Sequence, residues 1–564
     1  MWRAQADAYP REILVSDQAR PETEFRYIVH DIDVGLDEAE AQILTSLAKR
    51  LGVAAGALSR PVLVRRGVDA RHWRDVHFVM SYEVSLAAPL AEPLPNKVAR
   101  VEHSRIDPVR PESLPVASSR RASASVIVVG AGPAGLFAAL ALAEAGQGVV
   151  LIERGKPVER RMRDIGKLRT RAELDPESNL CFGEGGAGTY TDGKLYTRIK
   201  HPFMRWVLAC FVRFGAPESI LVDAHPHLGT DKLVHIVRAM RLRLIELGGE
   251  VRFDTRVDDL LVHRGAVVGV RTSAGEELRG QAVILATGHS ARDTYERLEA
   301  LGIPLEPKAF AVGVRAEHPQ ELVNTIQLGA AAGHPALGAA DYALSAQLPD
   351  EHVGKRGVYS FCMCPGGLIV PSPTEAGGMA VNGMSNAKRG GRFANSGLVV
   401  QVTPEDLMRN GYAEGPLMGV AFQRALEQAT FHAAGDRYYA PAMRMMDFLK
   451  QNATGKLAPT RFRPGAVAAD LWQVLPELVS QPLARGLAEF DRKMHGYVTK
   501  EANLFGSETR TSSPLRIVRD QDMQCTGFHG LYPVGEGAGY AGGIVSAAVD
   551  GLKAAAAILA SEEG

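Results

Sequence analysis

Residues 125–153, with the sequence SVIVVGAGPAGLFAALALAEAGQGVVLIE, decide the fold of the central part of the chain. Residues 126–129 form a continuous apolar run, which is typical of a strand buried on both faces. The turn Gly130-Ala131-Gly132-Pro133-Ala134-Gly135 follows directly, and the Ala- and Leu-rich residues 136–145 predict a helix. Residues 149–152 predict a second buried strand. This order of strand, turn, helix and strand predicts a Rossmann-like α/β unit that binds a dinucleotide.

The glycines of this turn each have a physical role in such a unit. Gly130 permits the tight turn, Gly132 lets the backbone approach a pyrophosphate, and Gly135 lets helix and strand pack closely. The helix N-terminus presents unpaired N–H groups and a positive dipole end to phosphates. Glu153 ends the second strand, where its carboxylate is expected to accept hydrogen bonds from a ribose 2′-hydroxyl. The expected nucleotide contacts in this stretch are Gly130, Gly132, Pro133, Ala134, Gly135, Glu153 and Arg154.

Four later features favour FAD as the dinucleotide. Residues 183–189 form a second glycine-rich loop, placed where the ribityl-phosphate side of a flavin would pass. Short predicted strands between residues 250 and 278 are followed by an apolar strand, 282–286, that ends in Thr287-Gly288, which is typical of flavin domains. Residues 531–537 predict a strand followed by Glu536, an acid able to hold ribityl hydroxyls. Residues 539–544 then open an Ala-rich helix, whose positive N-terminal end would stabilise the anionic reduced flavin. The expected contacts are Gly185, Gly186, Ala187, Gly188, Thr189, Val257, Thr287, Gly288, Gly535, Glu536, Gly543 and Ile544.

Several sequence blocks also carry a resemblance to a known family. They are Asp69-Ala70-Arg71, Asp192-Gly193-Lys194-Leu195, Thr511-Ser512-Ser513-Pro514, and residues 182–189, 287–294, 361–367 and 535–543. With these blocks the chain resembles the bacterial "FAD-dependent dehydrogenase" proteins, a family of poorly defined function within the glutathione-reductase-type FAD superfamily. The resemblance implies bound FAD, redox chemistry and a small extra N-terminal domain. It does not identify a substrate.

The expected fold class is α/β. We expect a Rossmann-like FAD-binding domain of the glutathione-reductase type, an inserted substrate domain of β-sheet and helices, and an N-terminal ferredoxin-like α+β domain. In the N-terminal domain the pattern predicts a helix at 37–51 and strands at 25–34, 60–66 and 76–86. The expected boundaries are residues 1–95 for the small domain, 96–124 for a Pro-rich linker, 125–294 and 516–564 for the two parts of the FAD-binding domain, and 295–515 for the substrate or cap domain.

Composition limits the partners and the cellular location. Of 564 residues, 64 are Lys or Arg and 64 are Asp or Glu, and this zero net charge argues against a nucleic-acid partner. The five cysteines form no disulfide framework and fit a reducing, cytoplasmic compartment. Residues 1–20 contain no apolar segment typical of a secretory signal. Residues 126–146 are apolar enough to imitate a membrane span, but their glycines and Pro133 indicate a strand, a turn and a helix. We therefore expect no membrane span, and no residue spacing indicates a metal site.

Polar residues near the predicted cofactor are the candidates for catalysis. His289 directly follows the Thr287-Gly288 strand end, and Arg510 lies just before the C-terminal flavin strand. Lys388 and Arg392 belong to a cation cluster that is expected either to meet an anionic substrate or a cofactor phosphate, or to form a solvated turn. Cys362 and Cys364, the closest pair of cysteines, are expected to have packing or turn roles, with a redox role as the alternative.

The main hypothesis is a FAD-dependent oxidoreductase in which flavin N5 exchanges a hydride with a small organic substrate. The electron partner is left open between NAD(P)H and a protein, because the later Gly-x-Gly-x-x-Gly matches lack the context of a second nucleotide domain. One alternative is a single-component flavin monooxygenase. Another is a flavoprotein that acts on RNA or docks a protein through the N-terminal domain, where Arg65, Arg66, Arg71 and Arg74 form a basic cluster or a solvated face.

Overall fold

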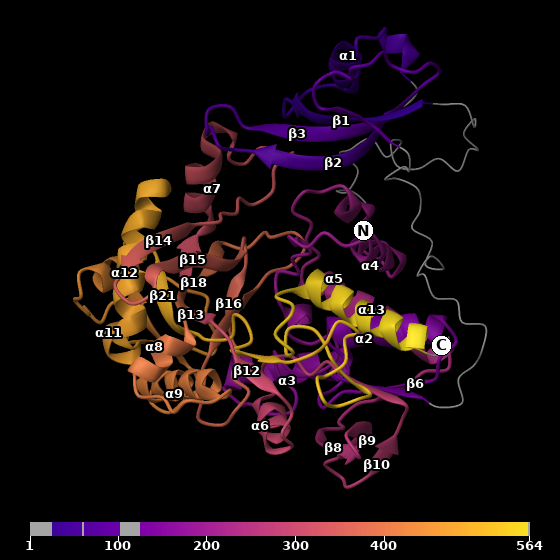
Figure 1. Ribbon diagram of the computed structural model, residues 1–564. Helices are drawn as coiled ribbons and strands as arrows, with labels where there is room; N and C mark the ends of the chain where they lie inside the picture. The colour runs from indigo at the N-terminus through magenta and orange to yellow at the C-terminus, as the bar shows by residue number, and fades with distance from the viewer. Residues whose placement is uncertain (1–24, 59–60, 102–124, 562–564) are drawn as a thin grey trace. The chain divides into compact units, whose positions relative to one another are not determined.

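The computed structural model describes residues 25–58, 61–101 and 125–561 (Figure 1). The described chain forms two compact units. The smaller unit contains residues 25–101 together with two segments from later in the chain, 217–226 and 327–338, and the larger unit contains the remainder.

The smaller unit is an antiparallel sheet of strand order β2-β3-β1-β4, and one helix packs on it. Tyr27, Val29 and Phe78 of the sheet and Leu47 of the helix share one buried core. The strands and the helix predicted here are confirmed. Their bounds are β1 (Phe25–Val34), α1 (Glu40–Leu51), β2 (Val62–Asp69), β3 (His77–Leu86) and β4 (Val98–Arg100).

Strand β4 corrects the predicted start of the linker at residue 96. Its three residues pair with Tyr27, Ile28 and Val29 of β1, so the sheet continues to Arg100. Pro93 and Pro95 gave this region the composition of a linker, although a short edge strand follows them. Residues 102–124 of the predicted linker, and residues 59–60 at the predicted start of β2, lie outside the described residues.

The arginines of the predicted basic cluster have partners inside the smaller unit. Arg66 donates to Asp223 of the segment 217–226 at 2.7 Å, and Arg71 binds Asp69 of its own strand. Arg65 lies 4.0 Å from Asp31, and the Arg74 guanidinium lies over the Trp73 ring. The cluster therefore consists largely of locally neutralised side chains.

The nucleotide-binding part of the larger unit is a parallel sheet of strand order β23-β11-β5-β6-β7. Every strand predicted from the stretch at residues 125–153 and from the apolar run at 282–286 is present. A small antiparallel sheet, β10-β9-β8, lies between β7 and β11 in the chain, as predicted. The bounds are β5 (Val126–Val129), α2 (Pro133–Glu144), β6 (Val149–Ile152), α3 (Val158–Arg171), α4 (Phe203–Arg213), α5 (Thr230–Glu246), β7 (Glu250–Arg252), β8 (Val257–His263), β9 (Ala266–Thr272), β10 (Glu277–Arg279), β11 (Ala282–Leu285), α6 (Arg292–Ala300), β23 (Leu531–Pro533) and α13 (Ile544–Ser561).

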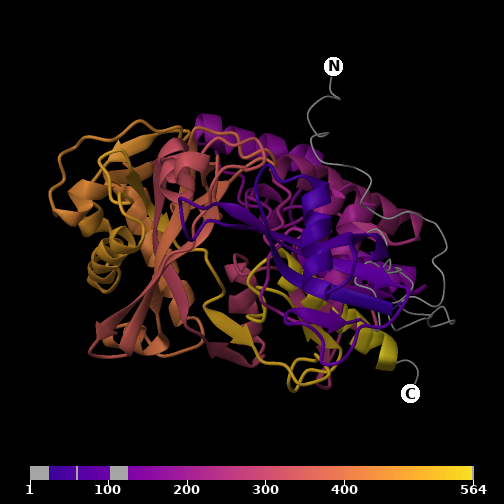
Figure 2. The same ribbon diagram turned by 90° about the horizontal axis from the view of Figure 1, so that it is seen from above.

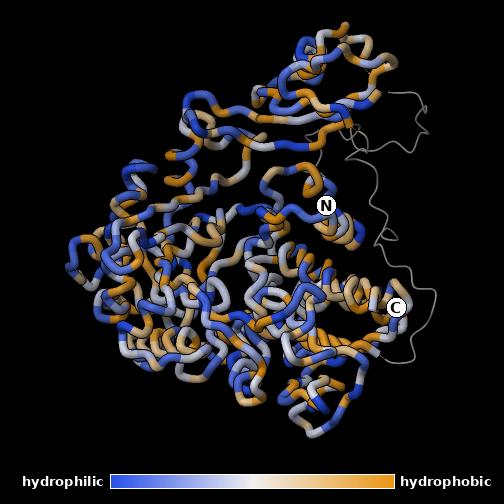
Figure 3. The backbone as a smooth tube through the Cα atoms, in the orientation of Figure 1, coloured by the Kyte–Doolittle hydropathy of each residue, from blue (hydrophilic) through white to orange (hydrophobic). Residues whose placement is uncertain are grey.

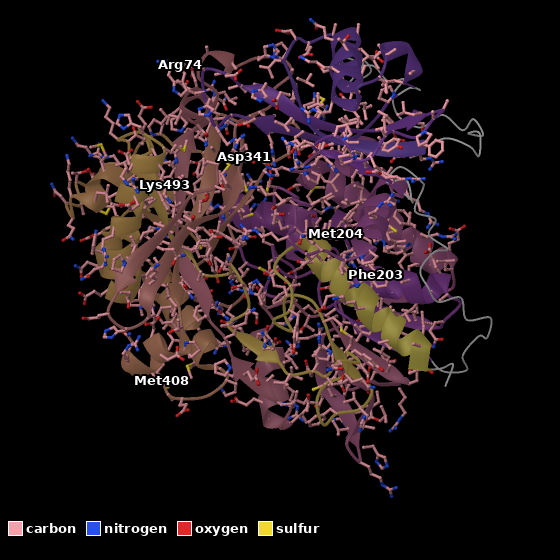
Figure 4. The ribbon with its side chains drawn as sticks, turned by 45° about the horizontal axis from the view of Figure 1, so that its top comes forward. Arg74, Phe203, Met204, Asp341, Met408 and Lys493 are labelled. Atoms are coloured by element: carbon pink, nitrogen blue, oxygen red, sulfur yellow. The ribbon has the colours of Figure 1, made fainter. Side chains whose placement is uncertain are left out.

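Helices α2 and α13 pack against each other, and both are mainly hydrophobic (Figure 3). A Cβ atom at Gly551 of α13 would lie 2.0 Å from the carbonyl oxygen of Ala134, so only glycine permits this close contact. Helix α4, whose first residues Phe203 and Met204 are labelled in Figure 4, also packs on α13. Within the described residues, α13 is the one helix long and apolar enough to cross a membrane, and most of it is buried inside the unit.

The second part of the larger unit is a seven-stranded sheet of order β14-β15-β18-β13-β21-β19-β20. Helix α12 packs on β13, β14, β15 and β18 (Figures 1 and 2), and Lys493 at its end donates to the Ser345 carbonyl oxygen (Figure 4). The bounds are β12 (Leu305–Pro307), β13 (Phe310–Pro319), α7 (Gln320–Leu328), β14 (Ser345–Asp350), β15 (Gly354–Cys364), β16 (Leu368–Pro371), β17 (Val381–Met384), β18 (Phe393–Val402), α8 (Pro404–Arg409), α9 (Met418–Ala433), β19 (Ala440–Arg444), α10 (Met445–Leu449), β20 (Ala466–Ala468), α11 (Leu471–Val474), α12 (Glu477–Lys493), β21 (Asn503–Glu508) and β22 (Leu515–Ile517).

The inserted sheet begins later than the predicted boundary at residue 295. Tyr295 and Leu298 of α6 belong to the same buried core as Val129 and Val283 of the parallel sheet. Residues 292–307 therefore extend the nucleotide-binding part, and the seven-stranded sheet starts at Phe310.

Candidate active site

One cavity of about 1010 Å³ lies inside the larger unit, where the nucleotide-binding loops face the seven-stranded sheet. The turns after β5, β6, β11 and β23 and the N-termini of α2 and α13 form one side of it. Residues of β15 and β17, together with Arg510 and Thr511, form the other side. Sixteen predicted cofactor contacts line it: Gly130, Gly132, Pro133, Ala134, Glu153, Arg154, Gly186, Ala187, Gly188, Val257, Thr287, Gly288, Gly535, Glu536, Gly543 and Ile544.

The glycine-rich loops contact each other through their backbones at the cavity wall. Without side chains between them, they fit a nucleotide. Gly186 has a φ of +62°, and a Cβ atom there would lie 3.0 Å from the Cα atom of Gly132. A Cβ atom at Gly188 would lie 2.9 Å from Cγ1 of Ile544, the first residue of α13. The two loops and the N-terminus of α13 thus form a smooth cradle, and the N-termini of α2 and α13 offer it free N–H groups.

Glu153 binds the backbone of three loops. Its carboxylate accepts hydrogen bonds from the N–H groups of Ala131 at 2.8 Å, Gly155 at 2.9 Å and Gly183 at 2.9 Å. Glu153 therefore fixes the glycine-rich turns relative to one another while it also lines the cavity. Its contact with a ribose hydroxyl stays a prediction.

Three predicted cofactor contacts do not line the cavity but support its wall. A Cβ atom at Gly135 would lie 1.9 Å from the Gly130 carbonyl oxygen, which is the close helix–strand contact expected for this glycine. A Cβ atom at Gly185 would lie 1.9 Å from Oγ1 of Thr189. Gly185 and Thr189 therefore pack against each other within the second loop.

Lys388 and Arg392 also lie outside the cavity lining, which corrects their place among the catalytic candidates. Both side chains are exposed, in the turn between β17 and β18. Arg389 between them points inward instead and forms an ion pair with the buried Asp192. Cations at a glycine-rich surface turn are easily solvated, so clustering in the sequence was a weak signal for ligand contact.

Arg510 lines the cavity and is held from behind by a buried ion-pair network. Its Nη2 donates to Glu427 at 2.9 Å, and Glu427 also accepts from both Nη atoms of Arg292, at 2.9 and 2.8 Å. Thr509 Oγ1 donates to the same carboxylate at 2.6 Å. Burial alone would raise the pKa of Glu427, but Arg510 and Arg292 hold it at about 2.

The remaining N–H groups of Arg510 have no hydrogen-bond partner. Its side chain is 4% exposed, and Nε and Nη1 are both buried and unpaired. A buried guanidinium with open donors is costly unless a ligand completes it. Arg510 lines the cavity, while these two nitrogens are themselves covered by protein atoms.

His289 and Glu536 face each other across the cavity wall. Nε2 of His289 lies 3.7 Å from Oε1 of Glu536. Burial, together with Arg510 and Arg292, lowers the pKa of His289 to about 3. Burial also raises the pKa of Glu536 to about 7. The pair therefore presents a neutral imidazole beside a carboxyl group that gains or loses its proton near neutral pH.

Sequence reasoning missed several polar residues of the cavity. Lys194, Lys308 and Asn382 line it, and Lys308 donates from Nζ to the Gly539 carbonyl oxygen at 2.9 Å. Glu427, which holds Arg510, also went unnoticed. Lys194 lies within a block quoted for the family resemblance, whereas Lys308 and Glu427 occur in segments without any motif.

Family models match the two parts of the larger unit. Residues 309–511 match the family described as FAD-dependent protein, C-terminal domain-like. Residues 234–338 match FAD dependent oxidoreductase, and residues 123–166 match FAD binding domain. A protein from Clostridium beijerinckii, named only as an uncharacterized protein, is 39% identical over 533 residues, which cover 94% of this chain and 98% of that one.

The chain belongs to this family of FAD-dependent oxidoreductases. It is a flavoprotein of mixed α/β fold, and its cofactor is FAD. The boundary of the C-terminal family model at residue 309 agrees with the start of β13 at Phe310.

Solved structures of flavoproteins are similar over most of the chain, at low identity. A geranylgeranyl bacteriochlorophyll reductase-like protein from Thermoplasma acidophilum is 14% identical, with a TM-score of 0.33, and the match covers 79% of this chain and 80% of that one. GidA from Aquifex aeolicus is 13% identical, with a TM-score of 0.29, and the match covers 78% of this chain and 65% of that one.

Proposed function

We propose that the protein exchanges a hydride between FAD and a small organic acid bound in the cavity beside Arg510. The observation that carries this proposal is that one cavity is lined both by the glycine-rich loops and by the polar face of the inserted sheet. A substrate held on that face would lie next to the cofactor. FAD, when bound, supplies two-electron chemistry at N5 of its ring system.

Arg510 supports an anionic group on the substrate. Its guanidinium places a positive charge at the cavity wall, which favours a carboxylate over a neutral group. Glu427 holds Nη2 of the guanidinium, so the position of this charge is fixed before the ligand arrives. Such preorganisation reduces the entropy lost on binding and orients the substrate.

His289 and Glu536 support a role in proton transfer. Hydride exchange at carbon is commonly coupled to a proton on an adjacent oxygen or nitrogen, which needs an acid or base nearby. With a pKa of about 7, the Glu536 carboxyl group can hold or release that proton at neutral pH. The neutral His289 can accept or donate a hydrogen bond without adding charge.

Two finer features of the fold belong to the same proposal. The parallel strand order β23-β11-β5-β6-β7 with the β8–β10 sheet supports a nucleotide domain of the glutathione-reductase type. The order β2-β3-β1-β4 supports a ferredoxin-like small domain that lacks the second helix, because residues 87–97 connect β3 to β4 without one. The electron partner is proposed to be NAD(P)H or a protein.

Replacing Arg510 by alanine tests this function. The measurement is anaerobic bleaching of the flavin by a panel of hydroxy, amino and unsaturated acids, each compared with its neutral amide. The wild-type protein is expected to be reduced by an acid and not by the matching amide. The Arg510→Ala variant is expected to lose about 10- to 150-fold in kcat/KM for the acid, since a hydrogen bond to a charged group contributes about 1.5–3 kcal/mol.

The controls separate the substrate from the cofactor. Arg492→Ala removes an exposed arginine of α12 and is expected to change nothing. Arg510→Lys keeps the charge but loses the planar guanidinium that Glu427 holds in place, so only partial recovery is expected. If Arg510→Ala weakens FAD binding as much as it weakens turnover, Arg510 binds the cofactor and the organic-acid proposal is wrong. Oxygen consumption that is coupled to NAD(P)H only when substrate is present would favour a monooxygenase instead.

A further inference from the structure

Cys362 and Cys364 lie at the end of β15, at the cavity wall opposite the glycine-rich loops. Cys362 is partly exposed and lines the cavity, and Cys364 is fully buried. The pairing of β15 with β18 is irregular between Phe361 and Cys364, so the strand bulges at these residues. Cys362 has a φ of +45°, which residues other than glycine seldom adopt and which costs about 1 kcal/mol or more. The fold thus maintains a strained backbone to place this thiol at the cavity.

A buried guanidinium lies against both cysteines. Arg315 of β13 is fully buried, and its Nη2 donates to the Cys362 carbonyl oxygen at 2.7 Å and to Cys364 Sγ at 3.4 Å. Glu508 balances the charge through Nη1 at 3.0 Å. The thiol of Cys364 itself donates to the Cys362 carbonyl oxygen at 3.3 Å. The two thiols and the guanidinium therefore form one compact cluster behind the cavity wall.

This surrounding gives the two thiols opposite proton affinities. A side-chain hydrogen bond with Cys364 lowers the pKa of Cys362 to about 6, together with the positive charges of Arg315 and Lys194. Burial of Cys362 acts in the opposite direction. The same hydrogen bond and burial raise the pKa of Cys364. The lowered pKa of Cys362 favours a thiolate at the cavity with a second thiol behind it, which is the arrangement of a reactive dithiol.

Cys210 and Cys525 are the buried cysteines of this chain that have a packing role. Cys210 and Cys525 are buried and do not line the cavity, and burial raises the pKa of both thiols, that of Cys525 to about 12. Among the residues that the structure describes, no arginine donates a hydrogen bond to the sulfur of either one. Cys362 differs from them in exposure to the cavity, in backbone strain and in its neighbouring charges.

We propose that Cys362 and Cys364 are a second redox centre, which exchanges two electrons with the FAD bound in the same cavity. The inference rests on FAD binding, but not on the organic acid proposed above. In the oxidising direction the Cys362 thiolate and the Cys364 sulfur form a disulfide bond. The two sulfurs lose two electrons, and Cys364 loses its proton. Oxidised FAD takes up both electrons and this proton to become the reduced anion FADH⁻, so charge and mass balance.

The short spacing suits a reversible centre. Only one residue separates the cysteines, and a disulfide across so short a loop is strained and therefore easily reduced. The bulge at Phe361–Cys364 relieves part of this strain because the strand departs there from regular geometry. A pair of this kind passes electrons between a flavin and an external thiol or disulfide.

An anaerobic reductive titration of the air-oxidised holoprotein tests the proposal. The wild-type protein is expected to take up two electrons for the flavin and two more for the disulfide. Cys362→Ser is expected to take up only the two flavin electrons, and Cys364→Ala likewise. The matched control Cys525→Ser is expected to behave as the wild type does. Equal electron uptake by the wild type and Cys362→Ser overturns the proposal.

A second measurement does not depend on the cofactor or on turnover. The peptide that contains Cys362 and Cys364 is expected to lose the mass of two hydrogen atoms after oxidation and to regain it on reduction. Finding both thiols free in the oxidised protein contradicts the inference. If the protein binds no FAD but still forms this disulfide, the failure lies in cofactor binding and not in the dithiol.

Discussion

Glu427→Gln is expected to lower the free energy of unfolding by about 3–5 kcal/mol, the loss typical of removing one partner from a buried ion pair. Glu427 is 2% exposed, and it is the carboxylate that binds the Arg510 guanidinium. Arg292 retains Glu375 at 2.7 Å after the substitution, whereas Arg510 is left as a buried charge without a partner. The measurement is denaturant unfolding of the holoprotein at pH 7.

A double variant and a surface control define the cause of this loss. If the cost arises from the unpaired Arg510 charge, Glu427→Gln combined with Arg510→Met should recover much of the lost stability. Glu489→Gln breaks an exposed pair with Arg492 on α12 and is expected to cost less than about 1 kcal/mol. A loss below about 1 kcal/mol for Glu427→Gln would show that the network does not depend on this carboxylate.

The same network predicts how stability depends on pH. The pKa of Glu427 is about 2 in the folded protein, against an ordinary value of 4.5. A lowered folded-state pKa contributes stability that is fully present above pH 4.5 and is lost as the pH falls toward 2. Lowering the pKa of Glu427 from 4.5 to about 2 corresponds to about 3 kcal/mol of stability. The Glu427→Gln variant should lack this contribution, so its difference from the wild type should shrink between pH 5 and pH 2.

The nucleotide-binding part could be predicted from the sequence because its signals are local. The strand, turn, helix and strand of residues 125–153 lie in one continuous stretch, and each glycine there has a steric role that neighbouring residues reveal. The same holds for the strand that ends in Thr287-Gly288. The structure places nearly all of these residues around one cavity.

The polar side of the cavity could not be predicted in the same way, because its partners are distant in the chain. Arg510 and Glu427 are separated by 83 positions, and Arg292 and Glu427 by 135. No pattern in either segment indicates that the two side chains meet. Strand β18 was missed for a related reason, since the buried Asn395 and Ser396 interrupt its apolar pattern. Such buried polar residues are explained only by the tertiary contacts that satisfy them.

The cation cluster at Lys388 to Arg392 shows the limit of charge density as a signal. The sequence left open a ligand site or a solvated turn, and the exposed side chains of Lys388 and Arg392 agree with the turn. Arg510 is buried and lines the cavity instead, although its sequence neighbours Thr509 and Thr511 carry no charge. Burial, which the sequence does not display, distinguishes a cation of the cavity wall from a solvated one.

Gly186→Ala is expected to weaken FAD binding by about 100-fold or more, equivalent to about 2.7 kcal/mol. The added Cβ atom would lie 3.0 Å from the Gly132 Cα atom, so the two glycine-rich loops must move apart at the wall that faces the cofactor. The φ of +62° at Gly186 adds strain of about 1 kcal/mol, because side chains disfavour this conformation. The measurement is a titration of the apoprotein with FAD, followed by flavin fluorescence.

Two further glycines separate crowding in the cradle from backbone strain. Gly248→Ala imposes the same kind of strain, at a φ of +91°, with open space around the added atom and away from the cavity lining, so FAD affinity should not change. At Gly188 the obstructing atom is 2.9 Å away and belongs to the side chain of Ile544 rather than to backbone, so Gly188→Ala should have an intermediate effect. If Gly186→Ala and Gly248→Ala reduce the affinity for FAD equally, the two loops do not form the binding cradle. If the loss of FAD affinity is largest for Gly186→Ala, smaller for Gly188→Ala and absent for Gly248→Ala, the close backbone contact between the loops determines how tightly the cofactor is held.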